Sequence, residues 1–471
     1  MQKVIFLLLF FSTKLFSYEL PELGSSFDGL INASDEKRIK FQIMQQVYSS
    51  SSVINDPEIN DYLNNMGQEL IDSGTGSRKE INFFLVQDNS INAFAMLGNV
   101  IGIHSGLLLA ANTESELASV LSHEIAHLTQ KHLLRLFDSQ KKNSYKSYLA
   151  LAIAMLAARS NPQIATGAIT AASASQTQNL LDYTRSNEQE ADRIGLEILD
   201  KAGYDPKGFI DFFSTLQKFN NFSAGAAPAF LRTHPITSDR ISDIQDRLKD
   251  YKYFQKKNKF EFYLIKSKLK AFTLNKNDVI DIFKNEIKMK RYLNEASAHY
   301  GLAYSYLRKN NISKARETFS MLESMKLESP LIVELNANIL IQEKKYQEAY
   351  DLYRLGLQIY PFYRAFIIGI SNLILQFNQP DKVIELVENY LPPYEKDPIF
   401  YKLLSKAYNQ KGNYLLEHEN LSDAYYFQFD IQNAISQMDL ATKTNSENFF
   451  EKSRVDHRLK ELKREAELMN N

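Results

Sequence analysis

The sequence predicts two parts of different fold class: a mostly helical α+β domain, followed by an all-α solenoid. Up to about residue 250, helical patterns surround a short strand at 81–87 and two apolar runs joined by a turn. Beyond about residue 250, lysine, tyrosine and phenylalanine become dense, and helical patterns repeat at a fixed period. A chain of 471 residues can form two or three domains with their own cores.

The N-terminus is typical of a secretion signal. Lys3 precedes the apolar run Val4–Phe11, which is too short to span a bilayer, and Ser17 is a small residue suited to cleavage. We expect a signal peptide at residues 1–17 and export to the periplasm of a Gram-negative cell. Lys14 is unusual in such a signal, so an uncleaved anchor is the alternative.

Two helices, at 35–48 and 57–71, are expected before the strand at 81–87. Gly98-Asn99, between two apolar runs, predicts a hairpin turn followed by a strand that leads to the next helix. An exposed sheet edge can hold an extended peptide through main-chain hydrogen bonds. The candidate edge residues are Asn92, Ala93, Phe94 and Ala95. The alternative is ordinary core β structure.

A helix is expected over 114–137, a stretch without proline or glycine. Thr113 and Glu116 predict a capping box at its start. Its apolar residues recur at helical spacing and would face a core; they are Leu117, Val120, Leu121, Ile125, Leu128 and Leu133.

This helix carries the motif His123-Glu124-Ile125-Ala126-His127. Residues four apart share one face of a helix, so the two imidazoles can bind one Zn²⁺ together. Glu124 would reach a water molecule activated by the ion and act as its general base. The alternative is a helix with ordinary surface or core histidines.

Two acidic residues, Glu188 and Asp192, follow in the stretch Asn187–Arg193, and Glu188 lies 61 positions after His127. Because they lie four apart, they would share one face of a helix. Catalytic zinc needs a third protein ligand and an open fourth position. One carboxylate could bind the ion while the other orients a histidine. Gln130 and Leu133 stand where another zinc-peptidase pattern has glycine and a third histidine, so a downstream glutamate is the better candidate. The alternative is a solvated charged helix face.

Three motifs together resemble the gluzincin metallopeptidase family of HtpX and the CAAX prenyl endopeptidases. They are the N-A-F-A…G…I-x-I-x-x-G-L-L pattern at 92–108, H-E-I-A-H, and E-x-E-A-D-R-x-G. The resemblance covers about residues 35–250 by motif and is greatest to a soluble periplasmic branch with C-terminal tetratricopeptide repeats. It implies a zincin-type metalloprotease domain with one Zn²⁺ per chain. His123, His127 and Glu188 would be the ligands, Glu124 the base, and Asp192 a residue that orients a ligand.

The resemblance extends to Arg232-Thr233-His234-Pro235 and Arg240, which match the family's H-P-x-x-x-x-R element. In the periplasmic branch this histidine can approach the zinc as a fourth ligand. His234 is therefore a candidate regulatory ligand that closes the site. The alternative is that His234-Pro235 simply begins a helix through Ile241, Ile244 and Leu248.

Between the motifs, the segment 148–175 contains an apolar stretch at 148–158 that is too short to span a membrane. We expect a packed helical hairpin over the site. The alternatives are a lid or a peripheral membrane contact.

The C-terminal part repeats every 34 residues. Ile312–Ala315 and Tyr346–Ala349 are 34 apart, as are Ala303 and Ala337. This is the tetratricopeptide period, in which small residues let paired helices pack closely. We expect about four degenerate repeats and a closing helix at 453–469. The alternative is a helical domain without repeats.

The expected domains are a signal peptide at 1–17, a metalloprotease at 18–250 and the repeats at 255–471. A net charge of −1 argues against a nucleic-acid binder, and the absence of cysteine excludes disulfides and thiolate zinc sites.

We expect a zinc-dependent endopeptidase that acts on polypeptides. The resemblance implies stalled or misassembled outer-membrane proteins as substrates and the barrel-assembly machinery as a partner. The alternative is a chaperone or adaptor that acts mainly through its repeats.

Overall fold

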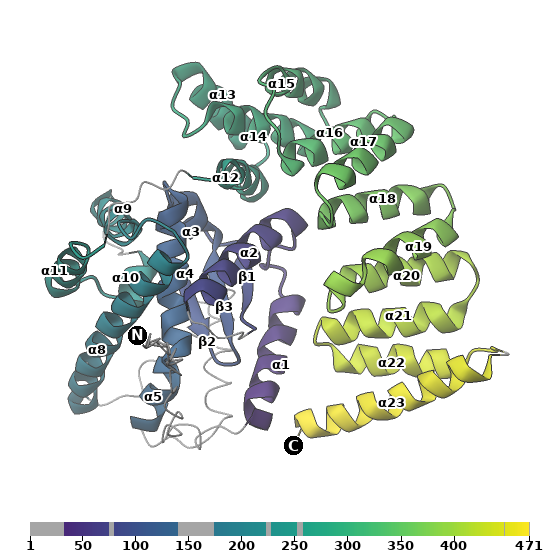
Figure 1. The fold of residues 1–471 in the computed structure, drawn as a ribbon, viewed down its shortest axis with the longest axis horizontal. Helices are drawn as coiled ribbons and strands as arrows, with labels where there is room; N and C mark the ends of the chain where they lie inside the picture. Colours follow the sequence, from purple (N-terminus) through teal and green to yellow (C-terminus); the bar gives the residue numbers. More distant parts are fainter. Residues whose placement is uncertain are drawn as a thin grey trace, which may run out of the picture.

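The computed structural model describes residues 33–74, 80–139, 174–222, 228–251, 258–446 and 448–470. Helices surround a small sheet in the N-terminal part, and the C-terminal helices form an arc that passes over this part and down beside it (Figure 1). The α+β, mostly helical class of the first part and the all-α solenoid that follows are both as predicted. The expected signal peptide lies outside the described residues, as does the segment 148–175 apart from its last two residues.

The elements of the N-terminal part are α1 (Ala33–Ser49), α2 (Pro57–Gly74), β1 (Asn82–Val86), β2 (Ala93–Met96), β3 (Val100–His104), α3 (Ser105–Ala110), α4 (Glu114–Thr129), α5 (His132–Ser139), α8 (Ala174–Lys201), α9 (Gly208–Phe222), α10 (Ala229–Thr233) and α11 (Ser238–Arg247). Among the helices that the structure describes, none has the length and apolar character needed to cross a membrane.

The sheet has the strand order β1-β3-β2, with β1 parallel and β2 antiparallel to β3. The predicted hairpin is confirmed: Gly98 and Asn99 both have positive φ angles, of 78° and 58°, in the turn between β2 and β3. Every residue of β3 is buried, so the central strand fixes the sheet within the domain. The edge strand β2 lies against α4.

Helix α4 begins as predicted and ends early. The Thr113 side chain accepts a hydrogen bond from the Glu116 amide, while the Glu116 carboxylate accepts one from the amide of Asn112. The expected continuation to residue 137 is wrong, because Lys131 takes a left-handed conformation with a φ of 53° and separates α4 from α5. Nothing in the apolar spacing indicated this break.

The solenoid begins at residue 260 and consists of successive helix pairs. Its helices are α12 (Phe260–Thr273), α13 (Asp278–Met289), α14 (Glu295–Arg308), α15 (Ile312–Ser324), α16 (Pro330–Gln342), α17 (Tyr346–Ile359), α18 (Arg364–Gln376), α19 (Pro380–Tyr390), α20 (Pro398–Gln410), α21 (Tyr414–Phe427), α22 (Ile431–Thr442) and α23 (Phe449–Asn470), with a 3-10 turn at Pro392–Tyr394. The alanines that marked the repeat, Ala303, Ala315, Ala337 and Ala349, are fully buried where helices meet. The closing helix starts at Phe449, four residues earlier than predicted.

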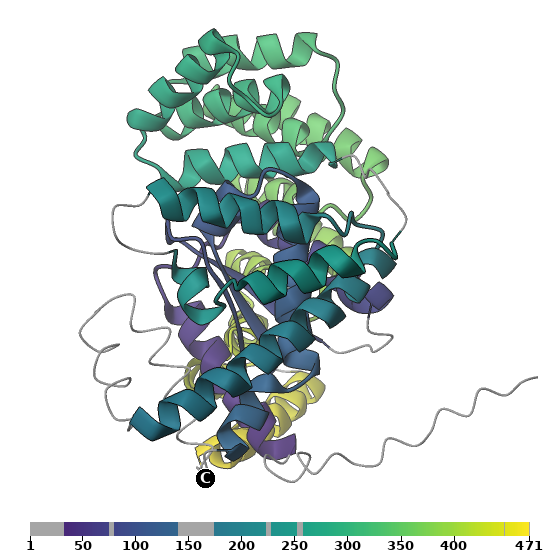
Figure 2. The ribbon, with the colours of Figure 1, turned by 90° about the vertical axis from the view of Figure 1, so that its left-hand side faces the viewer.

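The solenoid contacts the N-terminal part near both of its ends (Figures 1 and 2). At the first contact, the Lys268 ammonium of α12 lies 2.7 Å from Asp56 and 2.5 Å from Glu58 at the start of α2. Tyr363, which lies between α17 and α18 in the middle of the solenoid, donates a 2.8 Å hydrogen bond to the same Glu58. At the far contact, the Phe429 ring packs against Phe41 of α1, with ring centroids 5.4 Å apart. The arc is therefore held against the first domain by buried charge at one end and by aromatic packing at the other.

We expect Lys268→Ala to lower the free energy of unfolding by about 3 kcal/mol, because Glu58 would keep a buried charge without its main partner. Urea unfolding followed by circular dichroism measures this change. Replacing both residues by methionine should cost less, since no buried charge remains. Lys249→Ala, which breaks an exposed ion pair, is the matched control and should leave the unfolding midpoint unchanged. A Lys268→Ala chain as stable as this control would contradict the interpretation.

Candidate active site

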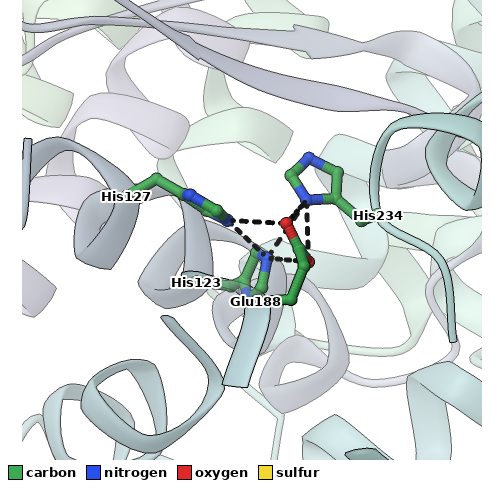
Figure 3. Close-up of side chains that lie close together, drawn as sticks. All are labelled: His123, His127, Glu188 and His234. Atoms are coloured by element: carbon green, nitrogen blue, oxygen red, sulfur yellow. Dashed lines mark hydrogen bonds and ion pairs between the residues drawn. The ribbon is translucent and has the colours of Figure 1, made fainter. Parts of the chain in front are cut away.

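Four side chains from three segments meet at one point: His123 and His127 of α4, Glu188 of α8, and His234 just after α10 (Figure 3). Each offers one ligand atom, and these four atoms lie within 4.8 Å of one another. The Nε2 atoms of His123 and His127 are 3.0 Å apart. The Glu188 carboxylate lies 3.4 Å from His123 Nε2 and 3.3 Å from His127 Nε2. The sequence pattern predicted this meeting of two histidines with a downstream glutamate.

The close packing of α4 on α8 makes this geometry possible. Gly195 faces α4 one turn after Asp192, and a Cβ atom there would lie 3.1 Å from the backbone nitrogen of His123. A larger residue would push the helices apart, so the glycine of the E-x-E-A-D-R-x-G pattern has a packing role. His123 and Glu188 are both buried, at 2% and 3% exposure.

Each histidine of α4 turns its other ring nitrogen to a partner outside the cluster. His123 Nδ1 lies 3.0 Å from Asp192. Arg240 binds the same carboxylate with two hydrogen bonds, of 2.6 and 2.7 Å, and also lies 3.0 Å from Glu188. Such outer partners fix the tautomer and orientation of a ligating imidazole. Asp192 is thus placed where the sequence interpretation expected it.

His127 has a partner that sequence reasoning missed. His132 Nδ1 lies 2.8 Å from His127 Nδ1, and His132 Nε2 lies 3.1 Å from Glu190. Arg135 donates a 2.6 Å hydrogen bond to the same Glu190 carboxylate. The break at Lys131 turns His132 back toward α4, and because the sequence predicted an unbroken helix, it gave no signal of this role.

Burial and neighbouring carboxylates shift the pKa values of the two α4 histidines in opposite directions. Burial lowers the pKa of His123, but hydrogen bonds to Asp192 and Glu188 outweigh it and raise the pKa to about 9. Burial lowers the pKa of His127 to about 3. Burial also opposes ionisation of Asp192, yet His123 and Arg240 hold its pKa below the usual value. At neutral pH these pKa values leave His127 neutral and His123 protonated, so His123 would have to release a proton to bind a metal ion.

Glu124 lies beside the cluster and is 1% exposed. Its Oε1 atom has no hydrogen-bond partner among the described residues, although His234 Nε2 is 3.4 Å away. The other ring nitrogen of His234 lies 2.9 Å from Glu188. His234 thus lies between the candidate ligand and the candidate base.

His234 terminates α10 and does not begin a helix. Its amide donates a 2.7 Å hydrogen bond to the Phe230 carbonyl, and its ring stacks on the Phe230 ring with centroids 4.7 Å apart. The next helix, α11, starts four residues later, where the Thr237 side chain caps it. The alternative that His234-Pro235 starts this helix is therefore wrong.

The candidate peptide edge is a true edge strand within the described part of the chain. Ala93, Phe94 and Ala95 lie in β2, and Asn92 precedes it, its carbonyl accepting a 3.0 Å hydrogen bond from the His104 amide. In this antiparallel register, the main-chain groups of Ala93 and Ala95 face away from β3. One position earlier on that side, the Ile91 carbonyl accepts a 3.0 Å hydrogen bond from the Phe230 amide. The segment that carries His234 is therefore also bonded to this edge.

The donor set fits a zinc ion. Three imidazoles and one carboxylate are ligands that Zn²⁺ prefers, and bonds of about 2 Å at tetrahedral angles place ligand atoms roughly 3.3 Å apart. The distances between the His123, His127 and Glu188 ligand atoms lie near this value. The unsatisfied Oε1 atom of Glu124 beside them further suits a site in which a water molecule is activated.

Comparisons with known proteins agree with this geometry. A match to peptidase family M48 covers residues 57–248. A putative beta-barrel assembly-enhancing protease of Vibrio cholerae is 30% identical over 397 residues, covering 84% of this chain and 82% of the relative. The beta-barrel assembly-enhancing protease of Escherichia coli K12 is 27% identical over 447 residues, covering 94% and 91%. The mitochondrial metalloendopeptidase OMA1 of Schizosaccharomyces pombe is 28% identical over 164 residues, covering 35% and 45%.

The first two relatives align through both parts of the chain, whereas the third aligns over about a third of it. The family match spans all four clustered side chains and the edge strand beside them. The chain therefore belongs to peptidase family M48 and is a metalloendopeptidase.

Proposed function

We propose that this protein is a periplasmic zinc endopeptidase that rests in a closed state and cleaves polypeptides whose assembly into the outer membrane has stalled. One observation carries the proposal: the side chains of His123, His127, Glu188 and His234 cluster at one point, with the Glu124 carboxylate 3.4 Å from His234. In this proposal, His123, His127 and Glu188 bind one Zn²⁺ per chain. Asp192 orients His123, and Glu124 is the general base.

A bound zinc ion supplies the Lewis acid that polarises the scissile carbonyl and lowers the pKa of the attacking water. Glu124 takes the proton from that water and returns it to the leaving amine. Its burial and its unsatisfied Oε1 atom support this role, since no competing hydrogen bond among the described residues has to be broken. Once accessible, the edge at Ala93 and Ala95, whose main-chain groups face away from β3, would hold the substrate main chain in extended form.

The closed state rests on two contacts of one segment. His234 lies against both Glu188 and Glu124, where it would fill the ligand position that a catalytic zinc site keeps open. Phe230 bonds to the Ile91 carbonyl on the side of the sheet edge where a peptide would lie. Moving this segment away would free the metal and the edge together.

The substrate class follows from the relatives. The curated relatives that align over most of the chain carry the name beta-barrel assembly-enhancing protease, and this chain covers 82–91% of the length of two of them. We therefore propose outer-membrane polypeptides as substrates, the barrel-assembly machinery as a partner of the solenoid, and export through the predicted signal peptide. A chaperone or adaptor role is compatible with the same solenoid, and a catalytically dead variant separates the two.

We expect Glu124→Gln to reduce cleavage of unfolded β-casein by at least about a hundredfold, because glutamine cannot accept the proton. Zinc content should stay near one ion per chain, since Glu124 is not a proposed ligand. Gel-based cleavage assays with zinc measured by mass spectrometry test both points. Full activity in the variant would exclude Glu124 as the base. In cells, outer-membrane integrity preserved by the Glu124→Gln variant would favour the adaptor role, because this variant lacks the proposed base.

We expect His234→Ala to raise basal cleavage of the same substrate, because it removes the fourth ligand and leaves three. Arg232→Ala, an exposed change two residues earlier, is the matched control and should not alter the rate. Initial rates at equal zinc occupancy measure the effect. A His234→Ala enzyme no faster than the control would argue against a closing role.

We expect Asp192→Asn to weaken zinc binding by about 10- to 100-fold, because the partner that orients His123 and holds Arg240 loses its charge. Competition with a chromogenic chelator measures the affinity. Glu197→Gln, on the exposed side of the same helix, is the control. Equal zinc affinity in the two variants would show that Asp192 has no positioning role.

A further inference from the structure

A cavity of about 360 Å³ lies where the solenoid joins the protease domain, between the end of α3, helices α12 and α13, and the start of α14. Asn112 lines it just before α4 begins, whereas His123 lies nine residues after the first residue of that helix. At the rise of an α-helix, this separation is roughly 14 Å. The cavity is therefore distinct from the metal centre.

Positive charge exceeds negative charge in the lining. Lys266, Lys270 and Arg291 contribute three cations, and Glu286 contributes one carboxylate. That carboxylate pairs with Lys270. In the part of the chain that the structure describes, no carboxylate lies within 4 Å of the charged groups of Lys266 or Arg291.

The ammonium of the half-buried Lys266 has no anionic hydrogen-bond partner among the described residues. It donates a hydrogen bond to the Ala111 carbonyl, a neutral partner. Burial and the neighbouring Lys270 lower its pKa to about 8, although Glu116 opposes the shift. An anion in the cavity would favour the charged form of this lysine.

A serine hydroxyl also lines the cavity. Ser267 is 9% exposed, and its hydroxyl group can donate one hydrogen bond to a ligand atom in the cavity. The cavity thus combines two cations without carboxylate partners and one serine hydroxyl.

Most of the remaining lining is apolar or aromatic, and Asn112 and Ser297 are its other polar residues. The apolar and aromatic side chains are those of Leu109, Leu274, Phe283, Leu293, Ala298, Tyr263 and Tyr292. Leu293 is 54% exposed, so apolar surface continues to the mouth. A ligand for this cavity would carry one anionic group attached to an apolar group.

We propose that this cavity binds the C-terminal end of a polypeptide, with the terminal carboxylate between Lys266 and Arg291 and the last apolar side chain against Leu274 and Phe283. The assignment to a polypeptide rests on the proposed function, since a protease meets unfolded chains. A single carboxylate matches two unpaired cations beside a hydroxyl donor. The site would hold the end of a substrate at the junction of the two domains, apart from the bond to be cleaved.

The test uses the full-length zinc-loaded Glu124→Gln chain, so that binding is measured without cleavage. The probes are two fluorescein-labelled decapeptides rich in glycine and serine that end in two leucines, one with a free C-terminal carboxylate and one amidated. Fluorescence anisotropy should give at least about tenfold tighter binding of the free acid. Lys266→Met and Arg291→Gln should each reduce this ratio to about twofold or less.

Lys288→Gln, an exposed change on α13 outside the cavity, is the matched control and should keep the full ratio. Arg291 is exposed, so its replacement tests the site even if the Lys266 variant folds poorly. Equal binding of acid and amide by the parent chain would overturn the proposal. Failure of the proposed peptidase activity would be seen separately, as the absence of casein cleavage by the native chain.

Discussion

The close crossing of α4 and α8 is the constraint on which the rest of the site depends. It brings two histidines of one helix within reach of Glu188 on the other, and Gly195 keeps the backbones near enough. The cost of this arrangement is electrostatic, because Glu188 and Asp192 are both buried beside it. Arg240 offsets that cost by binding Asp192 with two hydrogen bonds while also contacting Glu188. The segment from α10 to α11 therefore stabilises the site and also carries the histidine proposed to close it.

The segment from α10 to α11 therefore connects access to the metal site with the stability of that site. His234 and Arg240 are only six residues apart, yet one lies against the ligand atoms and the other against the carboxylate behind them. The same segment reaches the sheet edge through Phe230. In the proposed function the solenoid would add a second level of selection, since it lies beside the protease domain and contacts it near both of its ends (Figure 1). Selectivity in this account comes from what can reach the site, because zinc chemistry itself does not distinguish one polypeptide from another.

Sequence reasoning succeeded where short-range patterns determine structure. The hairpin at Gly98-Asn99, the start of α4 and the 34-residue repeat all follow from local conformational preferences or periodic burial. It failed at the end of α4, because a single left-handed residue, Lys131, leaves no trace in the apolar spacing. The role of His132 depends on that break and on Glu190, 58 residues away, so neither could be inferred. The ionic contact of Lys268 with Glu58 was likewise invisible, since it joins two domains across 210 residues.

The central claim is that a zinc ion in the resting protein is held by His123, His127, Glu188 and His234 together. X-ray absorption at the zinc edge measures this directly on the purified chain, because it counts the imidazoles around the ion. The account predicts three imidazoles and one carboxylate in the native protein, and two imidazoles after His234→Ala. Two imidazoles in both proteins would contradict a resting site closed by His234.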